Sequence, residues 1–204
     1  MAGLSNVRNP RSNGGVQPAS NPVDLAAILG ASAERRRLLA RADLREPGWS
    51  FWELRNLNMH RVIGLLRPEL APGSVADLEA QVRGAVGRNF KRAWWRGLAF
   101  GIVVQVSPGA WTPADLEPMV DIRERHSGVL QWVLIAAPDG RSAVGVHTWE
   151  QVYLSRVYRE TVQALAAAGC QVATAVKGTD GLLTFLTSVS ELRGVEIPEY
   201  HDQP

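Results

Sequence analysis

The stretch VLQWVLIAAPDGRSAVGVH, residues 129–147, decides the fold. Its first part, 129–137, is apolar on both faces apart from Gln131, which is typical of a strand covered on both sides in the middle of a sheet. The turn residues 138–141 follow, including a glycine that accepts positive φ, and a second apolar run occupies 142–147. The stretch predicts a β-hairpin with a central first strand. The side chains that we expect to be wholly buried there are Trp132, Val133, Leu134 and Ile135.

The residues after the hairpin predict a strand–helix–strand unit. Thr148 and Gln151 form a capping box that opens a helix over 149–168, which Gly169 ends. Residues 170–176 then have the pattern of a strand. Because such connections are almost always right-handed, the two strands should be parallel. A last helix is expected over 182–192, followed by a polar tail, 194–204.

The residues before the hairpin predict mainly helices. Residues 1–22 are polar and rich in Gly, Asn, Ser and Pro, so we expect a disordered arm. A helix or helix pair is expected over 23–44. A short helix should follow to about Leu66, with Ser50 as N-cap and Glu53 at the capping-box position. A clear helix over 74–96, capped by Ser74, and a strand over 98–106 come next. The predicted fold class is α+β: one domain, 23–193, with a mixed sheet of about four strands preceded by a helical N-terminal half.

Composition limits the class of protein. A hydrophobic content of 46% and a charged content of 21% are ordinary for a globular domain. The longest apolar runs are far shorter than the ~20 residues of a membrane span, and residues 1–20 lack the apolar core of a secretory signal. The lone Cys170 cannot form an internal disulfide. These features predict a cytoplasmic protein without transmembrane insertion.

Charge is distributed unevenly along the chain. Residues 1–100 carry 15 basic and 8 acidic side chains, whereas residues 101–204 carry 7 and 12. This asymmetry favours either packing of the two halves against each other or an anionic partner for the first half.

The expected 74–96 helix has a basic face opposite its apolar stripe. At 100° per residue this face gathers one aromatic and four cationic side chains: Arg88, Lys91, Arg92, Trp95 and Arg96. A tryptophan among arginines can stack on a base or lie at a headgroup boundary while the arginines bind phosphates. The alternative is a solvated face whose Trp95 is covered by the N-terminal helices or by a second subunit.

The run Arg55-Asn56-Leu57-Asn58-Met59-His60 resembles the R-N-x-x-x-H signature of HEPN ribonucleases. The resemblance covers these six residues. It implies that Arg55 stabilises a phosphate and that His60 acts as an acid or base on a ribose 2′-hydroxyl, on paired helices of an all-helical fold.

Two further histidines suggest a weaker site. If His126 begins the first strand of the hairpin, it could lie near His147 and Glu150 at one end of the sheet and form an acid–base cluster. The alternative is a hydrogen-bonded histidine at a strand end beside a solvated charge run. No His/Cys spacing matches a zinc site and no glycine-rich phosphate loop is present, so we expect no metal and no cofactor.

The function expected from these features is that of a non-enzymatic binding or assembly module. It would present its Arg/Trp face to an anionic or protein partner: another copy of itself, another protein, nucleic acid or an anionic surface. Two alternatives stay open, a metal-independent HEPN-like ribonuclease using Arg55 and His60, and a phage or other assembly subunit.

Overall fold

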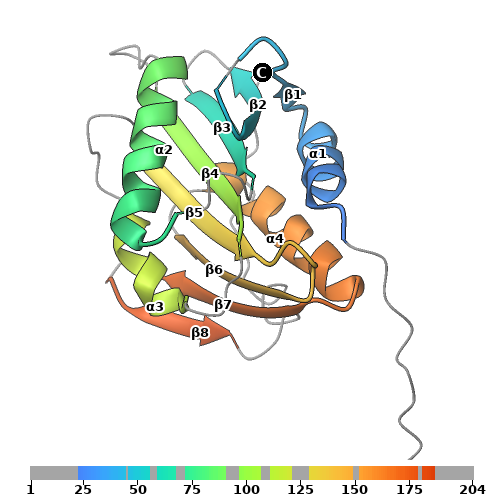
Figure 1. Ribbon diagram of the computed structural model, residues 1–204, viewed down its shortest axis with the longest axis vertical. Helices are drawn as coiled ribbons and strands as arrows, with labels where there is room; N and C mark the ends of the chain where they lie inside the picture. The colour runs from blue at the N-terminus through green and yellow to red at the C-terminus, as the bar shows by residue number, and fades with distance from the viewer. Residues whose placement is uncertain are drawn as a thin grey trace, which may run out of the picture.

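A computed structural model describes residues 23–44, 46–55, 59–67, 72–90, 97–106, 111–120, 129–148, 152–178 and 181–186. Within these ranges the strands form one eight-stranded mixed sheet whose spatial order equals the sequence order (Figure 1). The strands are β1 (Leu39–Ala40), β2 (Trp49–Arg55), β3 (Met59–Leu66), β4 (Gly97–Gln105), β5 (Val129–Ala136), β6 (Ser142–Thr148), β7 (Gln171–Lys177) and β8 (Leu183–Leu186). The helices are α1 (Leu25–Arg35), α2 (Val75–Asn89), α3 (Pro113–Leu116) with the 3-10 turn Glu117–Met119, and α4 (Val152–Ala167).

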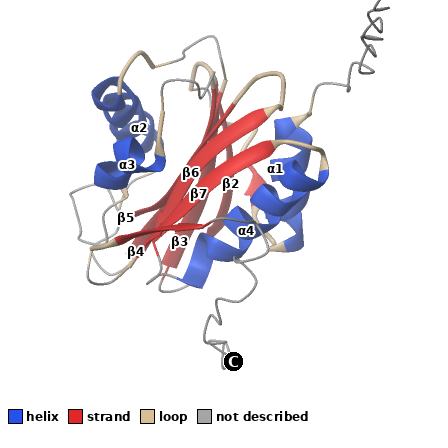
Figure 2. Cartoon of the chain, turned by 90° about the horizontal axis from the view of Figure 1, so that it is seen from below, coloured by secondary structure: helices blue, strands red, loops and turns tan. Residues whose placement is uncertain are grey.

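The helices lie in two layers, one on each face of the sheet (Figure 2). The face under α2 and α3 is filled by side chains such as Leu78, Val104 and Ile135, and the face under α1 and α4 by side chains such as Leu29 and Leu134. The alternation of side chains along β5 sends its residues into both layers. The expected burial of Trp132, Val133, Leu134 and Ile135 is confirmed.

Strand direction explains which helix covers which face. The pairs β3–β4, β4–β5 and β6–β7 are parallel, whereas β1–β2, β2–β3, β5–β6 and β7–β8 are antiparallel. Right-handed crossovers from strands that run the same way place their helices on the same face, so α2 and α3 share one. The β5–β6 hairpin reverses the direction, and α4, which follows β6, lies on the other face. The predicted hairpin and the predicted parallel crossover are therefore confirmed.

The predicted size of the sheet and the helical N-terminal half are wrong. The sheet has eight strands, and residues 50–55 and 59–66 lie in strands β2 and β3 in place of a helix. Ser50 and Glu53 match a capping box by spacing only. The aromatic content of β2 suits a pleated surface: Trp49 and Phe51 stack with ring centroids 5.4 Å apart. They lie over Gly64, where a Cβ atom would be 2.8 Å from the Trp49 ring.

Two other predicted helices also change. The helix expected over 74–96 begins as predicted, with the Ser74 hydroxyl accepting from the Asp77 N–H at 3.1 Å, but it ends at Asn89, and Gly97 begins β4. The helix expected over 182–192 is replaced at its start by β8. The expected arm, 1–22, and the expected tail, 194–204, lie outside the described residues.

Candidate binding surfaces

Arg55 and His60 come together, but on strands. They are directly opposite each other in the antiparallel β2–β3 pair, at the end where the chain passes from β2 to β3. Residues opposite each other share a face, and Glu53, two residues before Arg55, shares it as well. The His60 Nε2–H donates to Glu53 Oε2 at 2.7 Å, and the Arg55 guanidinium donates to the same oxygen at 3.3 Å. Arg41 donates to the other carboxylate oxygen. The four side chains form a cluster centred on Glu53.

The Glu53 carboxylate is held in its charged form. Burial alone would raise its pKa, but the hydrogen bonds from His60 and Arg41 and the charge of Arg55 outweigh burial, and the pKa lies below the ordinary value of 4.5. Two cationic partners therefore compensate this buried charge. The cluster fastens β1, β2 and β3 to one another.

The setting of His60 differs from the one that the HEPN resemblance implies. The ring is buried and meets the Phe90 ring edge-on, with centroids 5.5 Å apart. The motif lies on a β-hairpin and not on paired helices, so the all-helical fold implied by the resemblance is wrong for this chain. A catalytic role for Arg55 and His60 stays a prediction that the cluster geometry does not favour, because the imidazole is enclosed by protein.

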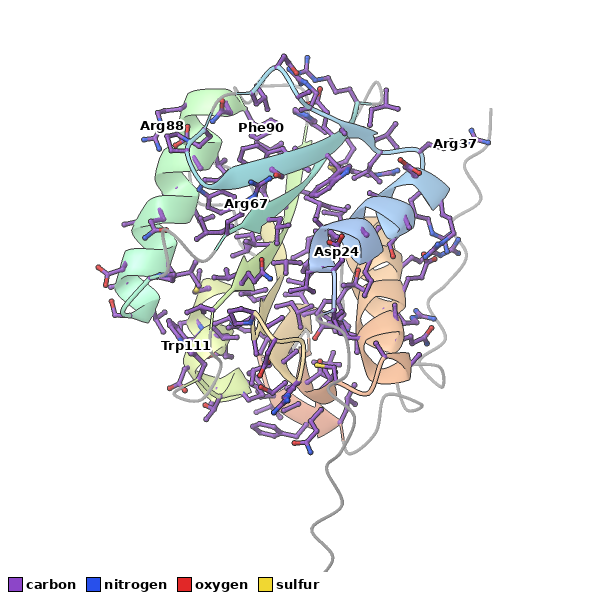
Figure 3. The ribbon with its side chains drawn as sticks, turned by 45° about the vertical axis from the view of Figure 1, so that its right-hand side comes forward. Asp24, Arg37, Arg67, Arg88, Phe90 and Trp111 are labelled. Atoms are coloured by element: carbon purple, nitrogen blue, oxygen red, sulfur yellow. The ribbon has the colours of Figure 1, made fainter. Side chains whose placement is uncertain are left out.

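The basic face expected on the 74–96 helix is reduced to Arg88 within the described residues. Arg88 lies on the outer side of α2, whereas Phe90 turns toward the sheet (Figure 3). The Arg88 Nε–H donates to Glu46 at 3.1 Å, and Asn89 donates to the same carboxylate at 3.0 Å. The charge of Arg88 is therefore matched inside the chain. The other members of the face, Lys91, Arg92, Trp95 and Arg96, lie outside the described residues, and their role stays a prediction.

The described residues on either side of the segment 91–96 lie near the 55–60 motif. Phe90, the last described residue before 91–96, contacts His60. Gly97, the first described residue after that segment, pairs with Met59. Both flanking residues thus lie beside β3, next to the 55–60 motif, although about forty residues separate the two regions in sequence.

His147 lies buried on strand β6. Its Nδ1–H donates to the Thr148 carbonyl at 3.1 Å, and its ring packs on Tyr158 with centroids 4.9 Å apart. Burial lowers the pKa of His147 to about 4, with a further lowering by the charge of Arg159. The ring is therefore neutral at pH 7. His126 and Glu150 lie outside the described residues, so the proposed grouping of the three stays a prediction.

The outer edge of β8 is the most apolar exposed feature among the described residues. The exposed large hydrophobic side chains of the described ranges are Leu39 on β1, which is 70% exposed, and Leu182 and Phe185 at β8, which are 67% and 57% exposed. All three lie at the two edges of the sheet. Sequence analysis missed β8, although Leu-Leu-Thr-Phe-Leu after a Gly turn, with positive φ at Gly181, has the composition of a strand.

Backbone groups of β8 are also directed outward. The Gly178 N–H donates to the Leu182 carbonyl at 2.9 Å, which fixes the alternation of the β7–β8 ladder. Thr184 and Leu186 are then the residues that exchange hydrogen bonds with β7. The N–H and C=O groups of Leu183 and Phe185 point away from β7, and no described strand pairs with that side.

The described part of the chain gives no indication of a metal site or of a membrane span. Its His, Cys, Asp and Glu side chains form no group of three or more that could hold a metal ion. None of its helices is both long and apolar enough to cross a bilayer.

Comparisons with known proteins identify no family for this chain. Family models, curated protein sequences and solved structures all gave no significant match to this chain.

Proposed function

We propose that this chain is an assembly module that associates with a second copy of itself by pairing the two β8 edges. The observation that carries the proposal is the combination, on one strand, of an exposed Phe185 and outward backbone N–H and C=O groups. An edge of this kind is a template for another strand.

A second copy suits this edge better than a charged partner does. Residues 181–190 contain no charged side chain, so two β8 strands meet without repulsion. Antiparallel pairing about a two-fold axis at Thr184 would place Leu183 of each copy opposite Phe185 of the other. Every outward backbone group of the two strands would then have a partner, and both Phe185 rings would lie on the same face of a continuous sheet.

The test is the mass of the full chain in solution. Sedimentation equilibrium should show a dimer whose population rises with concentration. Phe185→Lys should weaken dimerisation by about tenfold or more, because it places two like charges in the interface and removes an aromatic contact. The matched control is Leu39→Lys, which changes an equally exposed leucine on the opposite edge and should leave the dimer intact.

Amide hydrogen exchange distinguishes strand pairing from any other contact. In the dimer the Leu183 and Phe185 amides should be protected, and dilution or Phe185→Lys should make them exchange rapidly. A chain that is monomeric at all accessible concentrations, or a dimer that Phe185→Lys leaves unchanged, would overturn the proposal.

A further inference from the structure

Arginines gather where the C-terminal end of α1 lies beside α4. The two helices pack side by side on one face of the sheet (Figure 3). Arg35 and Arg36 end α1, and both donate to Glu160 of α4, Arg35 from Nε at 3.1 Å. Arg156 and Arg159 of α4 are one helical turn apart and therefore project from neighbouring positions on the helix surface.

Positive charge exceeds negative charge at this junction. Among the described residues, the Glu160 carboxylate is bound by Arg35 and Arg36, and its charge also acts on Arg159. Neither Arg156 nor Arg159 makes an ion pair within the described part of the chain. The Nε of Arg36 is buried and donates to no described acceptor.

Arg159 is affected by the positive charge of its neighbours. It is partly buried, and burial together with the charges of Arg156 and Arg36 lowers its pKa, against the opposing effect of the Glu160 charge. Like charges held at this spacing repel one another, and the repulsion destabilises the folded chain. An anion bound at the junction would replace this repulsion between arginines by attraction between each arginine and the anion.

We propose that Arg36, Arg156 and Arg159 form a binding site for a phosphate-type oxyanion. Guanidinium groups bind phosphate oxygens through paired, charge-assisted hydrogen bonds, and a compact tetrahedral dianion can contact several of them at once. The site is separate from β8 and does not depend on association of the chain.

The experiment is calorimetric titration of the full chain with inorganic phosphate, with sodium chloride of equal ionic strength as the reference. We expect saturable binding to the wild-type chain. Arg159→Gln should reduce the affinity for phosphate by about tenfold or more, because it removes charged hydrogen bonds from the site. Arg67→Gln is the matched control: it removes an exposed arginine that follows β3, and it should leave phosphate binding unchanged.

Thermal unfolding provides a second measurement. It distinguishes a binding role of Arg159 from a purely structural role. Without phosphate, Arg159→Gln should unfold at a temperature equal to or above that of the wild type, because it relieves repulsion. With phosphate, only the wild type and Arg67→Gln should gain stability. A marked loss of stability in phosphate-free Arg159→Gln would assign this arginine to the scaffold and overturn the proposal.

A parallel titration with a short single-stranded oligonucleotide separates the compact site from general polyanion binding. Binding of the oligonucleotide without any response to phosphate would overturn the proposal, as would phosphate binding that Arg159→Gln leaves unchanged. Saturable phosphate binding that Arg159→Gln weakens and Arg67→Gln does not would support it.

Discussion

The two edges of the sheet are built in opposite ways. The β1 edge is a strand of two residues whose neighbours are charged: Arg41 binds both Asp43 and the buried Glu53. Leu39 is the exposed hydrophobic side chain there. The β8 edge is longer, lies in a run of ten uncharged residues, and carries Phe185 and Leu182 at its surface.

This difference indicates which edge is protected against pairing with another strand. Short strands and charged side chains are the usual means by which proteins prevent edge-to-edge pairing. β1 is only two residues long, and the charged Arg41 that follows it binds Glu53 of β2. β8 is longer, at four residues, and is uncharged, so no charge on β8 opposes pairing with another strand. We infer that the chain ends its sheet at β1 and extends it at β8.

Glu53→Ala should give the largest effect, at the β1 edge. It removes the acceptor of Arg41, Arg55 and His60 and leaves a buried imidazole without that partner. We expect a loss of about 3 kcal/mol in the free energy of unfolding, near the low end for buried pairs because the two arginines are partly exposed. Urea denaturation measures it.

The matched change at the β8 edge is Phe185→Ala. Because Phe185 is exposed in the single chain, the loss should stay below about 1 kcal/mol. Both variants should be compared at a concentration where the chain is monomeric, since dimerisation stabilises by mass action. Equal losses for the two variants would remove the contrast between the edges.

Acid should weaken the β1 edge. In the folded chain the pKa of Glu53 lies below 4.5, and the hydrogen bond from Arg41 lowers that of Asp43 to about 2. A carboxyl group with a lowered folded pKa stabilises the folded chain above its unfolded pKa, and this contribution is lost as pH falls through the folded pKa. The free energy of unfolding should therefore decline from about pH 4.5 toward pH 2.

The acid effect has its own control. Glu53→Gln cannot ionise, so the decline in its stability over the same pH interval should be shallower than that of the wild type. Urea titrations at stepped pH values measure both. Parallel pH profiles for the two proteins would show that the cluster around Glu53 does not carry the acid sensitivity.

Salt should have the smallest effect, at the β8 edge. Pairing there uses apolar contacts and backbone hydrogen bonds, so raising sodium chloride from about 0.05 to 0.5 M should leave the dimer dissociation constant unchanged within about twofold. Sedimentation at the two salt concentrations is sufficient. A steep dependence on salt would mean that charged residues, and not β8, hold the copies together.

The sequence was most informative where local pattern and tertiary context agree. Residues 129–147 carry both the continuous apolar run of a central strand and the chemistry of a turn, and the hairpin is as predicted. The same holds for the β6–α4–β7 unit, whose helix repeats its apolar positions toward the sheet. The first turn of α4 also uses a tertiary contact, because the Gln131 side chain of β5 accepts from the Leu154 N–H at 3.1 Å.

The sequence pattern gave wrong predictions where a strand forms because it pairs with neighbouring strands. Residues 59–66 are hydrophobic enough for either a helix or a strand, and the choice is made by the eight-residue parallel ladder with β4. The capping-box spacing of Ser50 and Glu53 was misleading because the Glu53 carboxylate is used by Arg41 and His60 instead. β8 likewise depends on its pairing with β7.

The same distinction between local pattern and tertiary contacts applies to the candidate sites. The sequence by itself determined that Val133 to Ile135 would be buried, since this follows from hydrophobic content. It grouped Arg55 with His60 only through the HEPN resemblance, which implied helices where the structure has strands. Only the tertiary structure decided that Glu53 joins the pair, that Arg36 faces α4, and that β8 is an open edge. Those facts rest on contacts between segments far apart in the chain. Their free energy comes from packing and desolvation, which no local window of sequence contains.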